Sequence, residues 1–292
     1  MQIVRWWMVV TVLFAPLAVA NDYATDFGQC SEHFWQGVPP ATVFDPSGSN
    51  QYPLCFMGFA TLYSGVSNTA LYSAHHLTGR DIKKARKLPR KDSFRPETRL
   101  PVSHQSQLKD YKHSGYDRGH LVPNGDMPDV KRQYDSFSLA NIVPQNSEQN
   151  RGVWQQIESH VRTLSERYGE SYVVTGTGFS SHPDKLANMY IPSHLYKAIY
   201  LPSENIAVVY YSPNNANGTY ELIDVAELQN RVGINVFPQH NPRFVPAEFE
   251  LTSRPDNSQS KNTPPTANGD SNEGIWAMIA TVLLALLSLI HI

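Results

Sequence analysis

Apolar segments at both ends of this 292-residue chain restrict its globular core to the residues between them. At the N-terminal end, Arg5 is followed by an almost unbroken apolar stretch over 6–15, and residues 18–20 read Ala-Val-Ala. A basic residue, a short apolar run and a pair of small residues flanking a third are typical of a secretory signal peptide. We therefore expect a signal peptide over 1–20 and export of the chain, with an uncleaved membrane anchor as the alternative.

The opposite end, 275–292, contains 18 residues without a formal charge. As a helix it would be about 27 Å long, close to the thickness of a bilayer core. The preceding residues, 255–274, are rich in Pro, Asn, Ser, Thr and Gly, which predicts a flexible linker. We expect the tail to be a transmembrane helix that anchors the exported protein, with a tail removed during lipid anchoring as the alternative. In both cases 21–254 remain as the folded domain.

The only two cysteines of the chain, Cys30 and Cys55, lie near the start of this domain. Exported proteins enter an oxidising compartment, where a pair of cysteines normally forms a disulfide. No Cys-x-x-Cys pair or Cys-His signature favours a catalytic thiol. We therefore expect a disulfide between Cys30 and Cys55.

Hydrophobic patterns within the domain predict the α+β class. With 41% hydrophobic residues, the chain can bury a core. Apolar residues recur at intervals of three and four from Trp154 to Tyr168, which predicts a helix over 149–168, and a shorter helix is expected over 224–232. Strand-like runs occur at 56–63, 70–73, 172–175, 195–201 and 206–211, and the last two form a predicted hairpin. Strands interleaved with few helices are typical of α+β domains.

The densest chemistry in the sequence is the tetrapeptide Asp117-Arg118-Gly119-His120. A carboxylate, a guanidinium and an imidazole within four residues are suited to binding and deprotonating a substrate. The alternative is a surface ion pair beside a structural histidine. The tetrapeptide is therefore a candidate site that needs support from other residues.

Asn150 supplies that support. It lies on the same face of the predicted 149–168 helix as the apolar stripe, where an amide needs a partner. Its carbonyl oxygen could bind a hard cation, and the alternative is that Asn150 caps the helix. Glu158 lies about 12 Å further along the helix axis, too far for both residues to ligate one ion directly. Glu158 could act through water or form an ordinary helix pair with Arg162.

A formal net charge of −2 conceals a strongly basic segment. The twenty residues from Arg80 to Arg99 contain nine basic and three acidic residues, a net charge of +6. A solvated basic face is the usual explanation of such a run. Here the run precedes the 117–120 tetrapeptide, and positive charge beside His, Arg and Asn suits the binding and cleavage of phosphodiesters.

Three motifs in this order resemble the DNA/RNA non-specific endonuclease family of the ββα-metal (His-Me finger) superfamily, which includes mitochondrial endonuclease G. The motifs are Asp117-Arg-Gly-His120, Ser138-Leu-Ala-Asn-Ile-Val-Pro-Gln145, and Asn150-Arg-Gly-Val-Trp154 with Glu158. The resemblance implies a ββα-metal finger on a central antiparallel sheet flanked by helices. It also implies a Mg²⁺ cofactor, for which Mn²⁺ could substitute, and cleavage of DNA and RNA that leaves 5′-phosphates and has no strong sequence preference.

Carried over residue by residue, the resemblance implies a catalytic set. His120 would be the general base, since a neutral imidazole with a pKa of about 6.5 suits proton transfer at neutral pH. Asn150 would be the direct protein ligand of the metal, and Glu158 would hold metal-bound water. Arg118 would contact the phosphate or stabilise the transition state.

The resemblance implies roles for three further residues. Asp117 and Asn141 would support the site. Arg90 resembles the family's upstream arginine that contacts the phosphate. That last alignment leaves Arg86 and Arg95 as alternatives.

The leading hypothesis is an exported, membrane-anchored, Mg²⁺-dependent endonuclease that hydrolyses DNA and RNA through a domain at 21–254. The competing hypothesis is a membrane-tethered protein that binds nucleic acid through 80–99 without cutting it. Binding alone needs neither a base nor a metal ligand, so His120 and Asn150 favour the enzyme. A phosphodiesterase for small substrates is a third possibility.

Overall fold

The computed structural model describes residues 26–42 and 50–251. The expected signal peptide over 1–20, the linker over 255–274 and the apolar tail over 275–292 lie outside these residues. Among the helices in the described part of the chain, none has the length and apolar character needed to cross a bilayer. The described residues therefore include most of the expected 21–254 domain.

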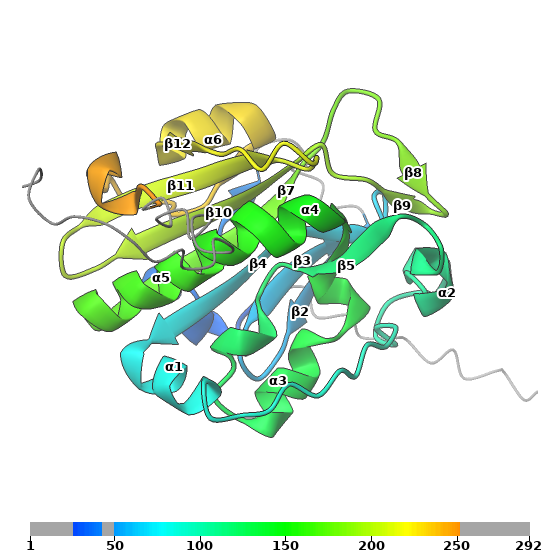
Figure 1. The fold of residues 1–292 in the computed structure, drawn as a ribbon, viewed down its shortest axis with the longest axis horizontal. Helices are drawn as coiled ribbons and strands as arrows, with labels where there is room; N and C mark the ends of the chain where they lie inside the picture. The colour runs from blue at the N-terminus through cyan, green and yellow to red at the C-terminus, as the bar shows by residue number, and fades with distance from the viewer. Residues whose placement is uncertain (1–25, 43–49, 252–292) are drawn as a thin grey trace, which may run out of the picture. The chain divides into compact units, whose positions relative to one another are not determined.

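A seven-stranded antiparallel sheet organises this domain, with the strand order β12-β11-β10-β7-β4-β3-β2 (Figure 1). Its strands are β2 (Gln51–Cys55), β3 (Ala60–Ser64), β4 (Thr69–Thr78), β7 (Glu170–Gly178), β10 (His194–Leu201), β11 (Ile206–Pro213) and β12 (Glu221–Ile223). Every neighbouring pair runs antiparallel. The central antiparallel sheet of the predicted α+β class is confirmed.

Within residues 26–42 and 50–251, three short two-stranded ladders lie outside this sheet. They pair β1 (Ala41–Thr42) with β13 (Ile234–Asn235), β5 (Tyr116–His120) with β6 (Ile142–Asn146), and β8 (Lys185–Leu186) with β9 (Met189–Tyr190). The β5–β6 ladder carries the Asp-Arg-Gly-His tetrapeptide, so it is the one that matters for the site.

The helices are mostly short. They are α1 (Gly79–Ala85), α2 (Leu108–Tyr111), α3 (Val130–Ser136), α4 (Ser147–Gln149), α5 (Gln155–Tyr168) and α6 (Val225–Val232). Single 3-10 turns occupy Ser31–His33, Trp35–Gly37, Val102–His104, Asn124–Asp126, Leu139–Asn141 and Pro246–Phe249. A π-helical turn, Asn150–Trp154, joins α4 to α5.

Both faces of the sheet are buried, because alternate residues of its strands enter two different hydrophobic clusters. On one face, Tyr196, Ala198 and Tyr200 of β10 pack with Leu228 of α6 and Phe34 of the N-terminal segment. The segment that contains Cys30 belongs to this layer. It therefore contributes to the core although it holds only 3-10 turns.

The other face carries the long helix α5, which runs across the sheet in Figure 1. Here Leu195, Ile199 and Leu201 of β10 pack with a stripe from α5 and with Ile82 of α1. The buried stripe of α5 and the turn before it consists of Trp154, Ile157, Val161 and Leu164. These are residues of the helical pattern seen in the sequence, so the pattern identified the face that binds the sheet.

Two elements differ from the sequence-based expectation. The apolar run over 56–63 is not one strand, because β2 ends at Cys55, the Phe56 N–H donates to the Phe59 carbonyl (2.9 Å), and β3 begins at Ala60. The helix expected over 149–168 is interrupted by the π-helical turn. In both places the hydrophobic pattern continues, but the backbone hydrogen bonds form a turn that interrupts the strand or the helix.

Other elements agree with the sequence. The hairpin of β10 and β11 pairs from His194 opposite Pro213 to Leu201 opposite Ile206, as the two strand-like runs predicted. The short helix expected over 224–232 is α6, with the Asp224 side chain accepting from the Glu227 N–H at its start.

The predicted disulfide is present. Cys30 is bonded to Cys55, with their Cα atoms 5.7 Å apart. The bond links the N-terminal segment to the end of β2, an outer strand of the sheet. It therefore holds a segment without regular strands against the core.

We expect the double variant Cys30→Ser/Cys55→Ser to lose about 3 to 4 kcal/mol of unfolding free energy, because the bond closes a loop of 25 residues in the unfolded chain. Urea unfolding of the oxidised protein and the variant measures the difference. Reduced wild-type protein is the control and should match the variant. Equal midpoints for the oxidised protein and the variant would contradict the prediction.

Candidate active site

The β5–β6 hairpin, α4, the π-helical turn and α5 form one continuous ββα unit. In the hairpin, Asp117 lies opposite Gln145 and His120 opposite Ile142. The following helical segment returns past the hairpin and brings Asn150 and Glu158 to the same pocket as His120. This pocket has a volume of about 320 Å³, and its lining includes Arg90, Arg118, His120, Asn150, Glu158 and Arg162.

Asp117 fixes the orientation of the Asn150 amide. Its Oδ2 accepts hydrogen bonds from Asn150 Nδ2 (2.9 Å) and Arg151 Nε (2.9 Å), and its Oδ1 accepts from Arg151 Nη2 (2.7 Å) and Ser147 Oγ (3.1 Å). Although burial opposes ionisation, these hydrogen bonds lower the pKa of Asp117. The Asn150 NH₂ group is thereby held by a carboxylate, which leaves the amide oxygen as the group that can bind a ligand.

The capping alternative for Asn150 is wrong. Asn146 caps α4, because its Oδ1 accepts from the N–H groups of Glu148 and Gln149. Asn150 instead begins the π-helical turn, in which Gly152 has non-helical backbone angles (φ −101°, ψ −108°). Such turns occur frequently at functional sites.

His120 is enclosed by aromatic rings. The edge of its imidazole faces Phe137, with ring centroids 5.0 Å apart, and Phe94 lies at 5.5 Å. The Nε2 atom is buried and has no hydrogen-bond partner among the described residues. Burial and the charge of Arg90 lower the pKa of His120 to about 3, well below the ordinary value expected from sequence. His120 is therefore a neutral imidazole at physiological pH.

Asn141 holds the backbone that follows His120. Its side chain is fully buried, and its Oδ1 accepts from the Val122 N–H (3.0 Å) while its Nδ2 donates to the carbonyls of Val122 (2.9 Å) and Ser136 (3.0 Å). The Leu121 N–H also donates to the Asn141 carbonyl (3.0 Å). The structure thus gives Asn141 contacts that fix the chain immediately after the imidazole.

Gly119 permits the Gln145 side chain to pack closely against β5. A Cβ atom at this position would lie 1.9 Å from Gln145 Oε1 on the paired strand. Gln145 Nε2 in turn donates to Gln149 Oε1 (2.6 Å), and Gln149 Nε2 donates to Ser212 Oγ of β11 (3.1 Å). These buried hydrogen bonds connect β6 and α4 of the ββα unit to the seven-stranded sheet.

Glu158 faces the pocket without a protein partner. Among the described residues, it makes no hydrogen bond or ion pair, and burial raises its pKa to about 7 despite the opposing charges of Lys197 and Arg162. The helix pair of Glu158 with Arg162 that the sequence allowed is absent, because Arg162 Nη1 donates to Asp126 instead (2.8 Å). The Glu158 carboxylate is therefore available to water or to a ligand.

A buried charge network that sequence reasoning missed lies beneath Glu158. Asp126 is buried and accepts from His75 Nε2 (3.1 Å) as well as from Arg162. Lys197 of β10 is only 2% exposed, and its Nζ donates to Thr175 Oγ1 (2.6 Å) and to the Leu121 carbonyl (3.3 Å). Burial lowers the pKa of Lys197 to about 8.

Arg118 is the pocket arginine whose charge is least satisfied. Its guanidinium lies over the Phe94 ring, 4.2 Å from the centroid, and it forms no ion pair with any described residue. The other three arginines of the pocket pair with carboxylates, Arg90 with Asp92, Arg151 with Asp117 and Arg162 with Asp126. Arg118 therefore presents the freest positive charge to a bound anion.

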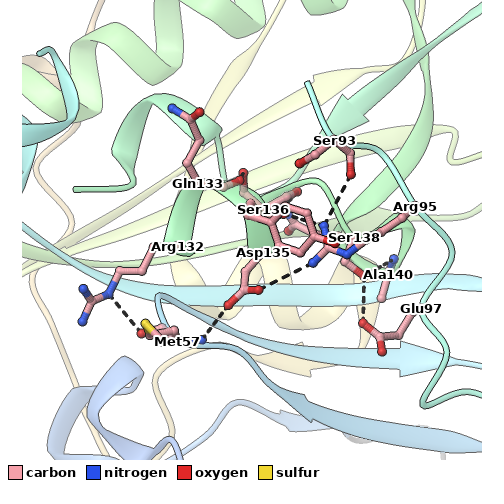
Figure 2. A network of polar contacts seen from close by, with 12 residues as sticks. Met57, Ser93, Arg95, Glu97, Arg132, Gln133, Asp135, Ser136, Ser138 and Ala140 are labelled. Atoms are coloured by element: carbon pink, nitrogen blue, oxygen red, sulfur yellow. Dashed lines mark hydrogen bonds and ion pairs between the residues drawn. The ribbon is translucent and has the colours of Figure 1, made fainter. Parts of the chain in front are cut away.

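The basic segment from Arg80 to Arg99 is partly neutralised by ion pairs. Five of its nine basic residues pair with nearby acids, in the ion pairs Lys84–Asp81, Arg86–Glu166, Arg90–Asp92, Arg95–Asp135 and Arg99–Glu97. Figure 2 shows Arg95 beside Asp135, and Glu97 bound by Ser138. Of the three candidate upstream arginines, only Arg90 lines the pocket.

The donors in the pocket suit a hard cation. Within the described residues, no group of three or more His, Cys, Asp or Glu side chains could hold a metal ion. The pocket instead offers the Asn150 amide oxygen and the Glu158 carboxylate. Oxygen donors in such small number fit an ion such as Mg²⁺, which retains several waters.

Several residues of the site carried no sequence signal. Phe94 and Phe137 surround His120, but aromatic residues of this kind are indistinguishable from core residues in the sequence. Asp126 and Lys197 belong to none of the three motifs, and nothing in the sequence shows that they are buried. Arg151 could have been noticed, because it directly follows Asn150.

The fold matches that of a solved structure. A chain in the crystal structure of the EndoG/EndoGI complex superposes with a TM-score of 0.60 and 24% sequence identity, covering 65% of this chain and 86% of that chain. The ββα unit on an antiparallel sheet is thus the fold of an established structural class.

The sequence model of the DNA/RNA non-specific endonuclease family matches residues 41–242, so this chain belongs to that family. It is 29% identical over 225 residues to the mitochondrial nuclease EXOG of Xenopus laevis, covering 67% of this chain and 62% of that protein. It is 31% identical over 176 residues to nuclease C1 of Cunninghamella echinulata var. echinulata, covering 54% of this chain and 69% of that protein. The family resemblance of the three motifs is confirmed.

We expect His120 to remain neutral from about pH 8 to about pH 5, because its pKa is lowered to about 3. A histidine-selective NMR titration of metal-free protein measures this, with the His120 signals assigned by comparison with His120→Ala. In urea-unfolded protein the same ring should titrate at about pH 6.5. A midpoint of about 6.5 in the folded protein would contradict the buried environment.

Proposed function

We propose that this protein is an exported endonuclease that uses Mg²⁺ to hydrolyse phosphodiester bonds of DNA and RNA and leaves 5′-phosphate ends. The observation that carries the proposal is the pocket shared by a neutral His120, an Asn150 oriented by Asp117, and an Arg118 free of carboxylates. Because this chain spans only 62% of the Xenopus nuclease, activity and substrates are proposed on the site and the family together.

His120 is the proposed general base. Its neutral imidazole can accept a proton from the attacking water, and since Nε2 is buried, Nδ1 is the nitrogen that would do so. Proton transfer of this kind contributes roughly 10²- to 10⁴-fold to rate. The low pKa makes His120 a weak base, but it keeps the ring deprotonated over the whole physiological range.

Arg118 and Arg90 are the proposed phosphate contacts. Both line the pocket, and both stack on aromatic rings, Arg118 on Phe94 and Arg90 on Phe137. Stacking holds each guanidinium in place. Arg118 has no ion pair with a described residue, whereas Arg90 donates from Nε to Asp92 and would bind phosphate oxygens through its terminal N–H groups. Their charges would stabilise the negative charge that develops on the phosphate. Contacts to phosphate carry no base information, so sequence preference would be weak.

Asn150 and Glu158 are the residues proposed to hold Mg²⁺, Asn150 through its amide oxygen and Glu158 through the water around the ion. When bound, Mg²⁺ would supply positive charge to the phosphate and to the departing 3′ oxygen. Asp117 would act on the ion only through Asn150, as residues behind a metal ligand commonly do. Asn141 would hold the backbone after His120 in place, so that the imidazole stays next to Asn150 and Glu158.

Export and membrane attachment are proposed on the terminal sequences alone. The signal-like segment over 1–20 supports export, and the apolar residues over 275–292 suit a membrane anchor. Some of the relatives are described as mitochondrial nucleases, and others carry only the name nuclease. The proposed compartment of this chain is therefore inferred from its terminal sequences and not from its relatives.

We expect His120→Ala to lower the rate of plasmid nicking by about 100-fold or more, because the proposed base is lost. His182→Ala is the matched control, since His182 is exposed and does not line the pocket. Circular dichroism checks that both variants fold. Nicking by His120→Ala at the wild-type rate would exclude the base assignment, whereas absence of nicking by the wild-type protein itself would favour the competing hypothesis of a binding protein that does not cut.

Nicking should stop in excess chelator and return when Mg²⁺ or Mn²⁺ is added. We further expect Asn150→Ala to raise the Mg²⁺ concentration for half-maximal activity by about tenfold or more, because the proposed direct ligand is removed. Calorimetric titration with Mg²⁺ provides a second measurement of the same loss. Full activity in chelator would show that the pocket has been misassigned, and cleavage of a dinucleotide but not of plasmid would indicate a phosphodiesterase for small substrates.

A further inference from the structure

A second pocket adjoins the proposed active site and shares Arg118 with it. This pocket, which we call the α2 pocket, has a volume of about 430 Å³ and is lined by Lys109, Tyr111, Lys112, Tyr116, Asp117 and Arg118, among others. It lies where α2 meets β5, the strand that ends at His120. A ligand that extends past Arg118 can therefore contact both pockets.

The α2 pocket is positively charged. Lys109 and Lys112 are exposed, and neither forms an ion pair with any described residue. The carboxylate of the pocket, Asp117, is already occupied by hydrogen bonds from Arg151 and Asn150. The positive charges of the two lysines therefore remain available to an anion.

The one acidic residue next to these lysines is also engaged elsewhere. Asp110 lies in α2 between them, and its Oδ2 accepts from the backbone N–H of Gln107 (2.8 Å) in a capping box. This cap fixes the start of the helix that carries Lys109. The contrast with the 80–99 segment is clear, because most basic residues there have acidic partners.

Aromatic side chains form the rest of the wall. Tyr111 is buried and Tyr116 is half-buried, so Tyr116 is the ring that a nucleotide base could contact. A cationic groove with aromatic side chains is the combination that binds single-stranded nucleic acid, through phosphates and base stacking.

We propose that the α2 pocket binds the backbone phosphate and nucleotide that flank the scissile phosphate, with Lys109 and Lys112 as the phosphate contacts. The substrate strand would pass over Arg118 from one pocket to the other. This inference rests on the proposed function, since it names where the same polyanionic substrate continues. It predicts a preference for polymers over small phosphodiesters, because only a polymer reaches both pockets.

The test is the binding of a fluorescein-labelled 20-nucleotide single-stranded DNA to the His120→Ala protein in chelator, followed by fluorescence anisotropy as a function of salt. Adding Lys109→Gln/Lys112→Gln should weaken binding by about fivefold or more and reduce the salt slope of log Kd by about 1.4, the value for two lost phosphate contacts on a single strand. Lys109→Arg/Lys112→Arg should restore both quantities.

The matched control is Lys83→Gln/Lys87→Gln, which removes the same charge from exposed lysines that line neither pocket. An equal loss of affinity in both double variants, or an unchanged slope for Lys109→Gln/Lys112→Gln, would overturn the proposal. If His120→Ala still cuts plasmid but the lysine pair sets the salt slope, the nucleic-acid site stands and the catalytic assignment fails. The two failures are therefore distinguishable.

Discussion

The carboxylate of Asp117 is the contact on which the geometry of the site depends. It lies on the first strand of the finger and accepts from Ser147, Asn150 and Arg151, which belong to the helical segment that follows the second strand. One side chain thus joins the two halves of the ββα unit and determines which end of the Asn150 amide faces the pocket. Because it also neutralises Arg151, it leaves Arg118 as the freest cation near the imidazole.

Exclusion of water is the second organising feature. Phe94 and Phe137 enclose His120 and also stack against the two arginines proposed to bind phosphate. The same rings therefore lower the basicity of the imidazole and position the cations beside it. Removing water strengthens the electrostatic interactions at such a site. The site would therefore stabilise negative charge on a phosphate well, although its imidazole binds a proton weakly.

The features that the sequence predicted correctly are those determined by residues close together in the chain. The stripe of α5, the β10–β11 hairpin and the three motifs could be read from spacing, because each is set by residues close in the chain. The sequence did not predict the π-helical turn at Asn150, the aromatic enclosure of His120 or the buried Asp126 network, since these depend on contacts between distant segments. The basic run was partly misleading for the same reason, because Glu166 and Asp135, which are distant in the chain, lower its local net charge from +6 to +4.

That partial neutralisation has a consequence for how the protein would meet the proposed substrate. A paired cation produces the field of a dipole, which decays faster than that of a single charge, and salt screens even single charges beyond about 8 Å. With an overall net charge of −2, and with the local charge of 80–99 lowered from +6 to +4 by these two acids, long-range attraction of nucleic acid would be weaker than the basic run alone indicates. Association would then be steered less by the 80–99 segment, and capture would depend more on the cations at the pocket itself, such as Arg118.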